Sequence, residues 1–196
     1  INADYYYNRI SDKIIAYPKG QQFRWTMLNL GLVKINGLDI NAQLHFVLPE
    51  NFYLTAKAQY TYQTAVDVTD PSDTYYGHQI PYIPWHSGSA VGILGWQNDW
   101  MQYGLNYSFI YVGERYNQQE NILFNYTQPW YTHDLSVYGE WDIYKVKGES
   151  LEVKGKKLFT LRVALDVNNL LSQDYDVILN YPMPKRNYKC TISITY

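Results

Sequence analysis

The feature that most constrains the fold of this chain is a period-two alternation of apolar and polar residues, which recurs in long runs along its 196 residues. In the C-terminal run, every second residue from Tyr188 to Tyr196 is apolar or aromatic, and Lys, Thr and Ser fill the positions between them. Successive side chains of a β-strand point to opposite faces of the sheet. The run therefore predicts a strand with one apolar and one polar face.

Similar runs predict eight strands of an all-β, antiparallel, up-and-down fold. The predicted strands span residues 3–15, 25–47, 52–68, 86–97, 100–113, 131–145, 158–172 and 187–196. Several are much longer than the about 5–6 residues that are typical of globular sheets. The alternation slips at Lys34–Gly37, which predicts a bulge or a strand end near Gly37.

The connections between the predicted strands alternate in length. Residues 49–51 and 97–99 form tight turns, and residues 16–24 form a connection of intermediate length. The long connections are 69–85, 114–130 and 173–186. Short turns at one end and long loops at the other are typical of a transmembrane β-barrel. Residues 146–157 fall on the short-turn side but are long, which predicts a small hairpin extension there.

Alternation alone does not separate a barrel in lipid from a soluble sandwich, because strands of both have one apolar face. Strand length favours the barrel, since a tilted strand crosses a bilayer with about 9–11 residues. Aromatic residues favour it too: they make up 17% of the chain and gather at predicted strand ends, where amphipathic rings suit the headgroup level. These predicted girdle residues are Trp25, Tyr53, Trp85, Trp96, Trp100, Tyr111, Trp130, Tyr131, Tyr144, Tyr188 and Tyr196.

Several classes of protein are excluded or disfavoured. No apolar run reaches the roughly 18–20 residues of a membrane-spanning helix. The net charge is −2, and acidic and basic residues are mixed along the chain, so the sequence does not predict the basic surface that binding of nucleic acid requires. Cys190 is the single cysteine of the sequence, so neither an internal disulfide nor a cysteine-based zinc site is expected. His133 and Asp134 are adjacent on a predicted strand and so point to opposite faces, and no Gly-x-Ser-x-Gly element occurs; we expect no catalytic residues and no enzyme.

The C-terminal part of the chain carries a recognisable set of motifs. These are Val167-Asn168-Asn169-Leu170-Leu171, Asp174-Tyr175, the run from Tyr181-Pro182-Met183-Pro184 to Tyr188, and the terminal aromatic residue Tyr196. The set resembles the C-terminus of TonB-dependent outer-membrane transporters. Leu171, Lys185 and Tyr196 are mild departures, since the family usually has Phe, Gly and Phe at these positions.

Further segments resemble the same family in the same order along the chain. They are Asp4 to Ile14, Asn29 followed by Gly37-Leu38-Asp39, and Ile80 to His86. The resemblance implies that residues 1–196 are the C-terminal portion of a 22-stranded barrel closed around a plug domain. We therefore expect the chain to be an excised piece, with the plug and the earlier strands outside it. A complete eight-stranded outer-membrane barrel with a structural or adhesive role, and a soluble carbohydrate-binding β-sandwich, are the alternatives.

The resemblance also implies a function and its partners. The family imports scarce, bulky nutrients across the outer membrane of Gram-negative bacteria, and the motifs favour cobalamin, an iron chelate or haem as cargo. The implied partners are outer-membrane lipid, the plug domain and TonB acting through it, the barrel-assembly machinery and the nutrient, with a surface lipoprotein left open. No cofactor and no resident metal are expected. The long loops would lie outside the cell.

Candidate site residues follow from this orientation. Side chains of the long loops that could stack on a flat ligand or contact it are Tyr75, Tyr76, His78, Tyr82, Tyr126 and Tyr181. Ordinary loop packing is the alternative role for each, and Trp85 and Trp130 are expected in the girdle. His78 and His86 could together bind iron, with structural roles as the alternative. The final strand resembles an assembly signal, carried by Tyr188, Ile192, Ile194 and Tyr196. Charged side chains on the polar face are expected to contact the plug or one another. They are Lys57, Asp67, Glu140, Asp142, Arg162 and Asp166.

Overall fold

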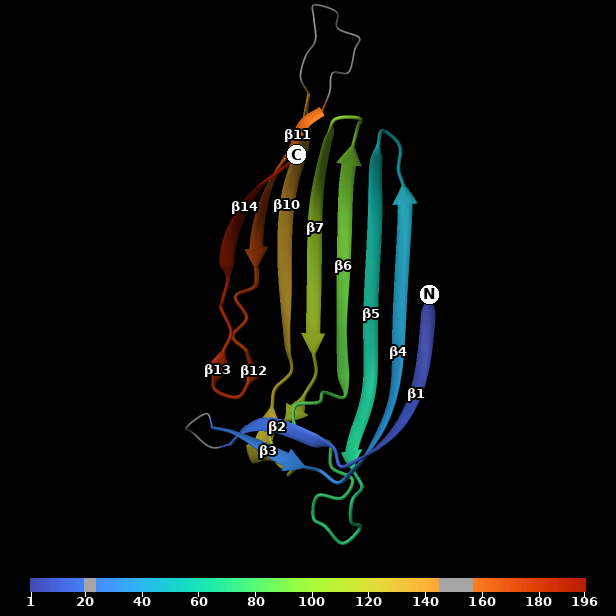
Figure 1. The fold of residues 1–196 in the computed structure, drawn as a ribbon, viewed down its shortest axis with the longest axis vertical. Coiled ribbons are helices and arrows are strands. Elements are labelled where there is room, and N and C mark those ends of the chain that lie inside the picture. The colour runs from blue at the N-terminus through green and yellow to red at the C-terminus, as the bar shows by residue number, and fades with distance from the viewer. Residues whose placement is uncertain (20–23, 145–156) are drawn as a thin grey trace, which may run out of the picture.

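The computed structural model describes residues 1–19, 24–144 and 157–196, and its dominant element is one eight-stranded sheet (Figure 1). In sheet order the strands are β1 (Asn2–Ser11), β4 (Leu32–Val47), β5 (Phe52–Asp67), β6 (His86–Gln97), β7 (Met101–Val112), β10 (Trp130–Tyr144), β11 (Lys157–Asn168) and β14 (Asn187–Thr195). All neighbours pair antiparallel. The predicted all-β, up-and-down arrangement is confirmed.

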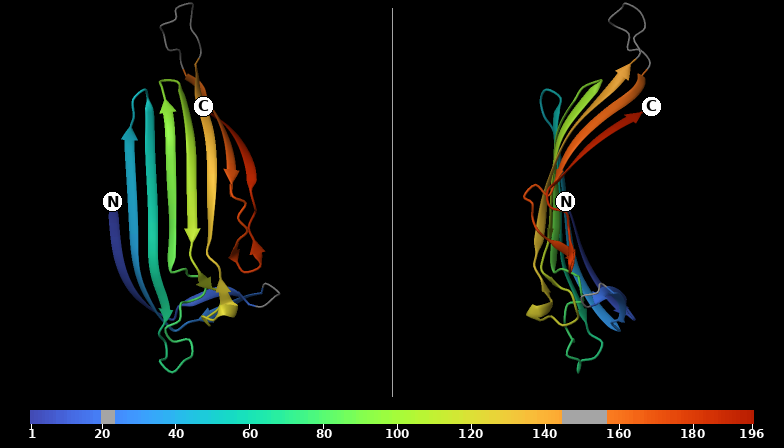
Figure 2. Two further views of the ribbon diagram at one scale, coloured as in Figure 1. Left: turned by 180° about the vertical axis from the view of Figure 1, so that it is seen from behind. Right: turned by 90° about the vertical axis from the view of Figure 1, so that its left-hand side faces the viewer.

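The sheet is open, with β1 at one edge and β14 at the other (Figure 1). A closed eight-stranded barrel would pair these two strands, and a sandwich would stack two sheets face to face. Seen edge-on, the eight strands instead form a single curved layer (Figure 2). The architecture is that of a partial barrel wall, and neither alternative fold describes it.

Two predicted strands are each broken at the end of the sheet that carries the long connections, called here the loop end. The predicted strand 3–15 leaves the sheet after Ser11, where Asp12 has a φ of 53°. Residues Ile14–Lys19 and Arg24–Asn29 then form a separate hairpin, β2–β3. Gly31, with a φ of 64°, returns the chain to β4, a conformation that glycine adopts without strain. The predictions of continuous strands 3–15 and 25–47 are therefore wrong.

The predicted long loops contain short elements of their own. These are β8 (Arg115–Tyr116), the 3₁₀ turn η1 (Leu123–Asn125), β9 (Tyr126–Thr127), β12 (Asp176–Ile178) and β13 (Tyr181–Pro182). At the opposite end, called the turn end, Glu50 and Asn51 have left-handed φ values of 59° and 67°, as two-residue hairpin turns require. The predicted hairpin extension at 146–157 falls almost entirely outside the described residues.

The predicted bulge or strand end near Gly37 is also wrong. β4 passes through Gly37 with one-to-one pairing to both β1 and β5. The glycine serves packing instead, because a Cβ atom there would overlap the ring of Tyr6, which lies flat across the strand. The same arrangement recurs at two further pairs, Tyr53 over Gly95 and Tyr138 over Gly104. These tyrosines can lie flat on the wall because the residue beneath each has no side chain.

The two faces of the sheet differ as the alternation predicts. One face, called the outer face, leaves aliphatic side chains uncovered: Leu44, Leu165 and Ile192 are 52%, 58% and 67% exposed. The other, called the inner face, carries polar side chains, among them the Thr61 hydroxyl that donates to Asp39 at 2.6 Å. A soluble protein rarely exposes so extended an apolar surface. The outer face therefore fits contact with lipid.

The inner face is held together by polar contacts between strands. Gln102 donates to the hydroxyls of Tyr53 and Tyr138, at 2.7 and 3.0 Å. Arg162 lies over the Tyr138 ring, 4.2 Å from its centroid, and pairs with Glu140 at 3.3 Å. The prediction that inner-face charges contact one another is confirmed for this pair.

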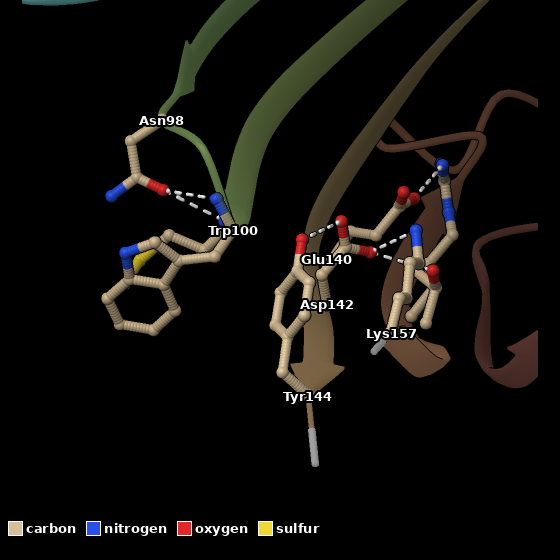
Figure 3. Close-up of polar contacts among 9 residues, drawn as sticks. Asn98, Trp100, Glu140, Asp142, Tyr144 and Lys157 are labelled. Atoms are coloured by element: carbon tan, nitrogen blue, oxygen red, sulfur yellow. Dashed lines mark hydrogen bonds and ion pairs between the residues drawn. The ribbon is translucent and has the colours of Figure 1, made fainter. Parts of the chain in front are cut away.

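Near the turn end, Asp142 gathers several partners (Figure 3). Lys157 pairs with its carboxylate at 2.6 Å, and the hydroxyl of Tyr144 donates to it at 3.5 Å. In the neighbouring turn, Asn98 accepts from the backbone N–H groups of Trp100 and Met101, which fixes the bend between β6 and β7 (Figure 3).

The predicted aromatic girdle is confirmed only in part. Trp96 stacks on Tyr103 on the outer face near the turn end, and Trp141 donates to the Tyr103 hydroxyl at 3.0 Å. Tyr53 and Trp130 lie on the inner face instead, so their assignment to a lipid-facing girdle is wrong. Trp25 belongs to the β2–β3 hairpin and not to a wall strand.

A small apolar core lies on the inner face at the loop end. Its buried members are Leu30, Val33, Ile35, Ala65 and Ile80. They come from β4, β5, the short link between β3 and β4, and the long connection after β5, and residues of β1, β2 and β3 pack against them. The core therefore fixes the β2–β3 hairpin and this connection over the inner face, where the loops form a mouth.

Candidate functional site at the loop end

The connection between β5 and β6, residues 68–85, is folded onto the sheet by a buried glutamine. Gln79 is 1% exposed, and its Oε1 accepts from the backbone N–H of Ala65 at 2.8 Å. Its Nε2 donates to the carbonyl of Ile83 at 3.2 Å, and its backbone forms a bridge with Val66. One side chain thus satisfies backbone groups of both the strand and the loop, which holds the loop in one arrangement.

An asparagine joins this loop to the next one, residues 113–129. Asn121 accepts from the backbone N–H of Gln79 at 2.7 Å and donates to the Gln79 carbonyl at 3.0 Å. A second link runs from the backbone N–H of Tyr82 to the carbonyl of Tyr116, at 2.8 Å. The two loops therefore form one hydrogen-bonded unit.

The last loop, residues 169–186, is attached through an arginine and an aromatic stack. Arg115 donates through Nη2 to the carbonyls of Asp176 and Val177, at 2.8 and 3.0 Å. Trp130, at the start of β10, stacks on Tyr175 with ring centroids 4.4 Å apart. These contacts bring three loops together at the mouth.

Two cavities flank Trp130. The first, of about 260 Å³, is lined by Trp25, Tyr82, Val112, Arg115, Trp130, Val177 and Ile178. The second, of about 390 Å³, lies between the 113–129 and 169–186 loops and includes Tyr126, Trp130 and Tyr175 in its lining. Both combine aromatic walls with a few polar groups, as small-molecule sites do.

The family described as TonB dependent receptor-like, beta-barrel matches residues 1–170. The chain belongs to this family. No curated protein sequence is significantly similar to it. Among solved structures, the crystal structure of BauA, the ferric preacinetobactin receptor from Acinetobacter baumannii, aligns with a TM-score of 0.56 at 12% identity. The alignment covers 99% of this chain and 34% of that receptor, and it shows likeness of fold.

The chain spans about a third of the length of the solved receptor. No helix in residues 1–19, 24–144 and 157–196 is long and apolar enough to cross a membrane. Over the same residues, no three His, Cys, Asp or Glu side chains gather into a group that could hold a metal.

The mouth of this TonB-dependent receptor-like barrel contains the predicted ligand residues in separate places. Tyr75 and His78 meet edge to face, with centroids 6.5 Å apart, and Tyr75 donates to Glu120 at 3.4 Å. Tyr82 lines the first cavity and Tyr126 the second. Tyr76, at 45% exposed, and Tyr181, at 42%, lie outside both.

The two histidines that were predicted as a possible iron site, His78 and His86, lie in different parts of the structure. His78 packs in the 68–85 loop, where its Nδ1 lies 3.2 Å from the carbonyl of Gln119. His86 lies on the outer face, and its Nδ1 is 2.7 Å from the hydroxyl of Tyr60. The structure therefore does not bring them into one site.

Sequence reasoning missed the residues that build the mouth. Gln79 and Asn121 are polar residues in loops, and nothing in the local pattern marks them as buried connectors. Arg115 follows a strand end, but its acceptors lie 61 and 62 residues further along the chain. Trp130 was predicted for the girdle from its position at a strand start. The density of aromatic residues in the loops was the only local signal.

Burial changes the acid–base properties of the mouth. Burial lowers the pKa of the Arg115 guanidinium and raises the pKa values of the Tyr82 and Tyr175 phenols. For Tyr82, the N–H of Leu179 and the charge of Arg115 oppose the effect of burial without cancelling it. A phenol whose folded pKa exceeds the ordinary value of 10.0 favours the folded mouth below pH 10.0. That contribution is lost as the pH rises through the folded pKa.

We therefore expect Tyr82 to ionise above its ordinary pKa of 10.0. The measurement is an alkaline absorbance titration of the full-length protein, from which the titration of the Tyr82→Phe variant is subtracted. The difference should titrate with a midpoint above 10.0, because burial disfavours the phenolate. A midpoint at or below 10.0 would show that water reaches the phenol freely.

Proposed function

We propose that this chain forms part of the wall and mouth of a TonB-dependent receptor that imports a bulky nutrient across the bacterial outer membrane. The observation that carries the proposal is the single-layered sheet with an exposed apolar outer face and a polar inner face, in a chain of this family. Transport by the whole protein, its substrate and its partners are part of the proposal, because the chain spans only part of such a receptor.

The proposed orientation rests on the resemblance to the family, whose final strand ends on the periplasmic side. The loop end, with its mouth of three joined loops, faces the outside of the cell, and the turn end and the C-terminus face the periplasm. The polar inner face contacts the plug domain, through which TonB supplies the work. The outer side of β14, with Tyr188, Ile192, Ile194 and Tyr196, contacts the barrel-assembly machinery before it contacts lipid. The proposed role is transport and not catalysis.

The proposed cargo is a bulky, metal-containing nutrient. An iron chelate is the first candidate, and cobalamin and haem are the others. The aromatic lining of the two cavities supports a ligand with flat or apolar parts. The likeness in fold to a ferric siderophore receptor agrees with this class. The predicted loop residues Tyr75, Tyr76, His78, Tyr82, Tyr126 and Tyr181 are proposed as contacts for the approaching ligand.

The test uses the full-length protein expressed in a bacterial strain that lacks its own receptors for these nutrients. Uptake of labelled ferric siderophores, cyanocobalamin and haem is measured with and without functional TonB. We expect uptake of one class, and its loss without TonB while surface binding remains. Binding of an oligosaccharide but of none of these nutrients would refute the cargo, and uptake that does not require TonB would refute the mechanism.

A further inference from the structure

The outer face of the sheet carries only two charged side chains among the described residues. They are Arg9 of β1 and Lys34 of β4, and both are cations. Every other outer-face position of the eight strands holds an apolar, aromatic, small or uncharged polar residue, with histidine counted as neutral. The remaining charged residues of these strands lie on the inner face. A pair of cations on an otherwise uncharged surface needs a physical explanation.

The core of the inner face fixes the direction of both side chains. Ile10, which follows Arg9, packs on this core, and Val33, which precedes Lys34, is a buried member of it. Because successive side chains of a strand point to opposite faces, Arg9 and Lys34 point outward. The two strands lie side by side at one edge of the sheet, and the two cations are direct Cα partners (Figure 1). Their Cβ atoms therefore lie about 4.5–5.5 Å apart.

Neither cation has a counter-charge. Within residues 1–19, 24–144 and 157–196, neither side chain forms an ion pair. Lys34 lies one strand in from the sheet edge, and its cross-strand partners on the two sides are Arg9 and Val66. Its diagonal neighbours Tyr7 and Thr64 are uncharged. Like charges directly opposite each other in a sheet are destabilising, so an anion that contacts both cations would relieve an unfavourable pairing.

The pair lies where the lipid-facing surface ends. Arg9 is near the last residue of β1 and Lys34 near the first residue of β4, both at the loop end. From Lys34 to Phe46 a tilted strand rises by about 30 Å, slightly more than the roughly 25 Å apolar band of an outer-membrane barrel. Tyr5 and Tyr7, at 72% and 52% exposed, lie next to the pair on the side of this band. Such rings are typical of the headgroup level, which places the cations among headgroups.

A phosphate-bearing lipid matches both parts of this surface. A guanidinium binds phosphate oxygens through two parallel N–H groups, and an ammonium adds a point charge. Tyr7 and Asn36, which are direct Cα partners beside the cations, provide uncharged donors. The apolar residues further along the strands suit acyl chains. Clusters of basic residues at a membrane interface attract anionic lipids in the same way.

We propose that Arg9 and Lys34 form a binding site for the phosphate group of an anionic lipid in the leaflet at the loop end of the wall. The site lies on the opposite face of the sheet from the small apolar core and takes no part in capturing a nutrient. It goes beyond the proposed function and shares with it only the location in the outer membrane.

The test compares two lipids that differ only in the phosphate. The full-length protein in detergent is incubated with dioleoyl phosphatidic acid or with dioleoylglycerol, and bound lipid is counted by native mass spectrometry. We expect phosphatidic acid to bind at least about tenfold more tightly, because two cations near an anionic group each provide about fivefold. Equal binding of the two lipids would overturn the proposal. Displacement of phosphatidic acid by an equal concentration of inorganic phosphate would refute a lipid as the occupant.

Variants assign the binding to the two cations. Arg9→Gln and Lys34→Gln should each lower the affinity for phosphatidic acid about fivefold, and the double variant about 25-fold. Arg9→Lys keeps the charge and should lower it less than Arg9→Gln. Lys189→Gln is the matched control, because Lys189 is exposed on the inner face of β14 and should not affect binding. An equal loss of affinity in this control would show that net charge, and not the pair, governs binding.

Stability without lipid separates loss of the site from loss of the fold. Removal of one of two adjacent like charges relieves their repulsion, so each Gln variant should unfold in urea at the same or a slightly higher concentration than the unchanged protein. Unchanged affinity in the folded double variant would overturn the proposal. Lipid binding requires neither TonB nor a nutrient. Failed nutrient uptake with phosphate-selective lipid binding would therefore refute the proposed function alone, and normal uptake with equal binding of the two lipids would refute the lipid site alone.

Discussion

Gly104→Ala is expected to destabilise the barrel by about 1–3 kcal/mol, the usual cost of forcing an extra methyl group into a packed position. Gly104 is buried on the inner face, and a Cβ atom there would overlap the ring of Tyr138. The ring has little freedom to move away, because Arg162 lies over its other side and Gln102 donates to its hydroxyl. The methyl group must therefore disturb contacts among three strands.

The control for this prediction is another strand glycine. A Cβ atom on Gly92, in β6, would meet nothing within 4 Å, so Gly92→Ala should leave stability unchanged or raise it slightly. Both variants are compared in the full-length protein by urea unfolding in detergent, followed by fluorescence. Equal stability of the two variants would show that the Tyr138 ring yields freely. A Gly104→Ala/Tyr138→Ala double variant should be less destabilised than the sum of the single changes, since the overlap is then gone.

Gln79→Ala is expected to release the 68–85 loop from the sheet. The change leaves the N–H of Ala65 without its acceptor, and Ala65 is fully buried. A buried donor without an acceptor costs about 1–3 kcal/mol. A free-energy change of this size should detach a single loop from the sheet. The side chain of Asn121 also hydrogen-bonds the backbone N–H and carbonyl of Gln79. The disturbance should therefore spread to the 113–129 loop.

The measurement is backbone hydrogen exchange, read by mass spectrometry on the full-length protein. Peptides from residues 68–85 and 113–129 should lose protection in Gln79→Ala, while peptides from β10 and β11 should not. Thr74→Ala serves as the control, because Thr74 is exposed on the same loop and its hydroxyl donates to the neighbouring Asp73 at 3.3 Å. If protection falls in the control too, or is retained in Gln79→Ala, the glutamine does not hold the loop.

The strands of the wall were predictable because their signal is local. The alternation from Tyr188 to Tyr196 depends only on the pleat of the backbone, which sends neighbouring side chains to opposite faces. The prediction failed where a strand leaves the sheet without losing its alternation. Ile14 and Ile15 continue an apolar run, but the left-handed turn at Asp12 sends them into the β2–β3 hairpin.

The role of Gly37 in its strand also depends on a residue of a neighbouring strand, which the local sequence does not reveal. The slip in the alternation predicts a bulge or a strand end near Gly37, although β4 is regular there. The residue that explains it is Tyr6, on a neighbouring strand, and the sequence does not state which ring will lie over which glycine. Strand register decides this, because the two Cα atoms of Tyr6 and Gly37 are direct partners across β1 and β4.

The amino-acid sequence by itself determined the all-β class, the wall strands, the apolar and polar faces and the family of this chain, because strand periodicity and turn chemistry are properties of short segments. Only the tertiary structure decided which residues meet at the mouth. Arg115 reaches Asp176 and Val177, and Asn121 reaches Gln79, across different loops. Such contacts depend on the register of the intervening strands, which places residues far apart in the chain at the same height on the wall. The contacts of the site therefore depend on strand register, whereas the strands of the wall follow from the local alternation of apolar and polar residues.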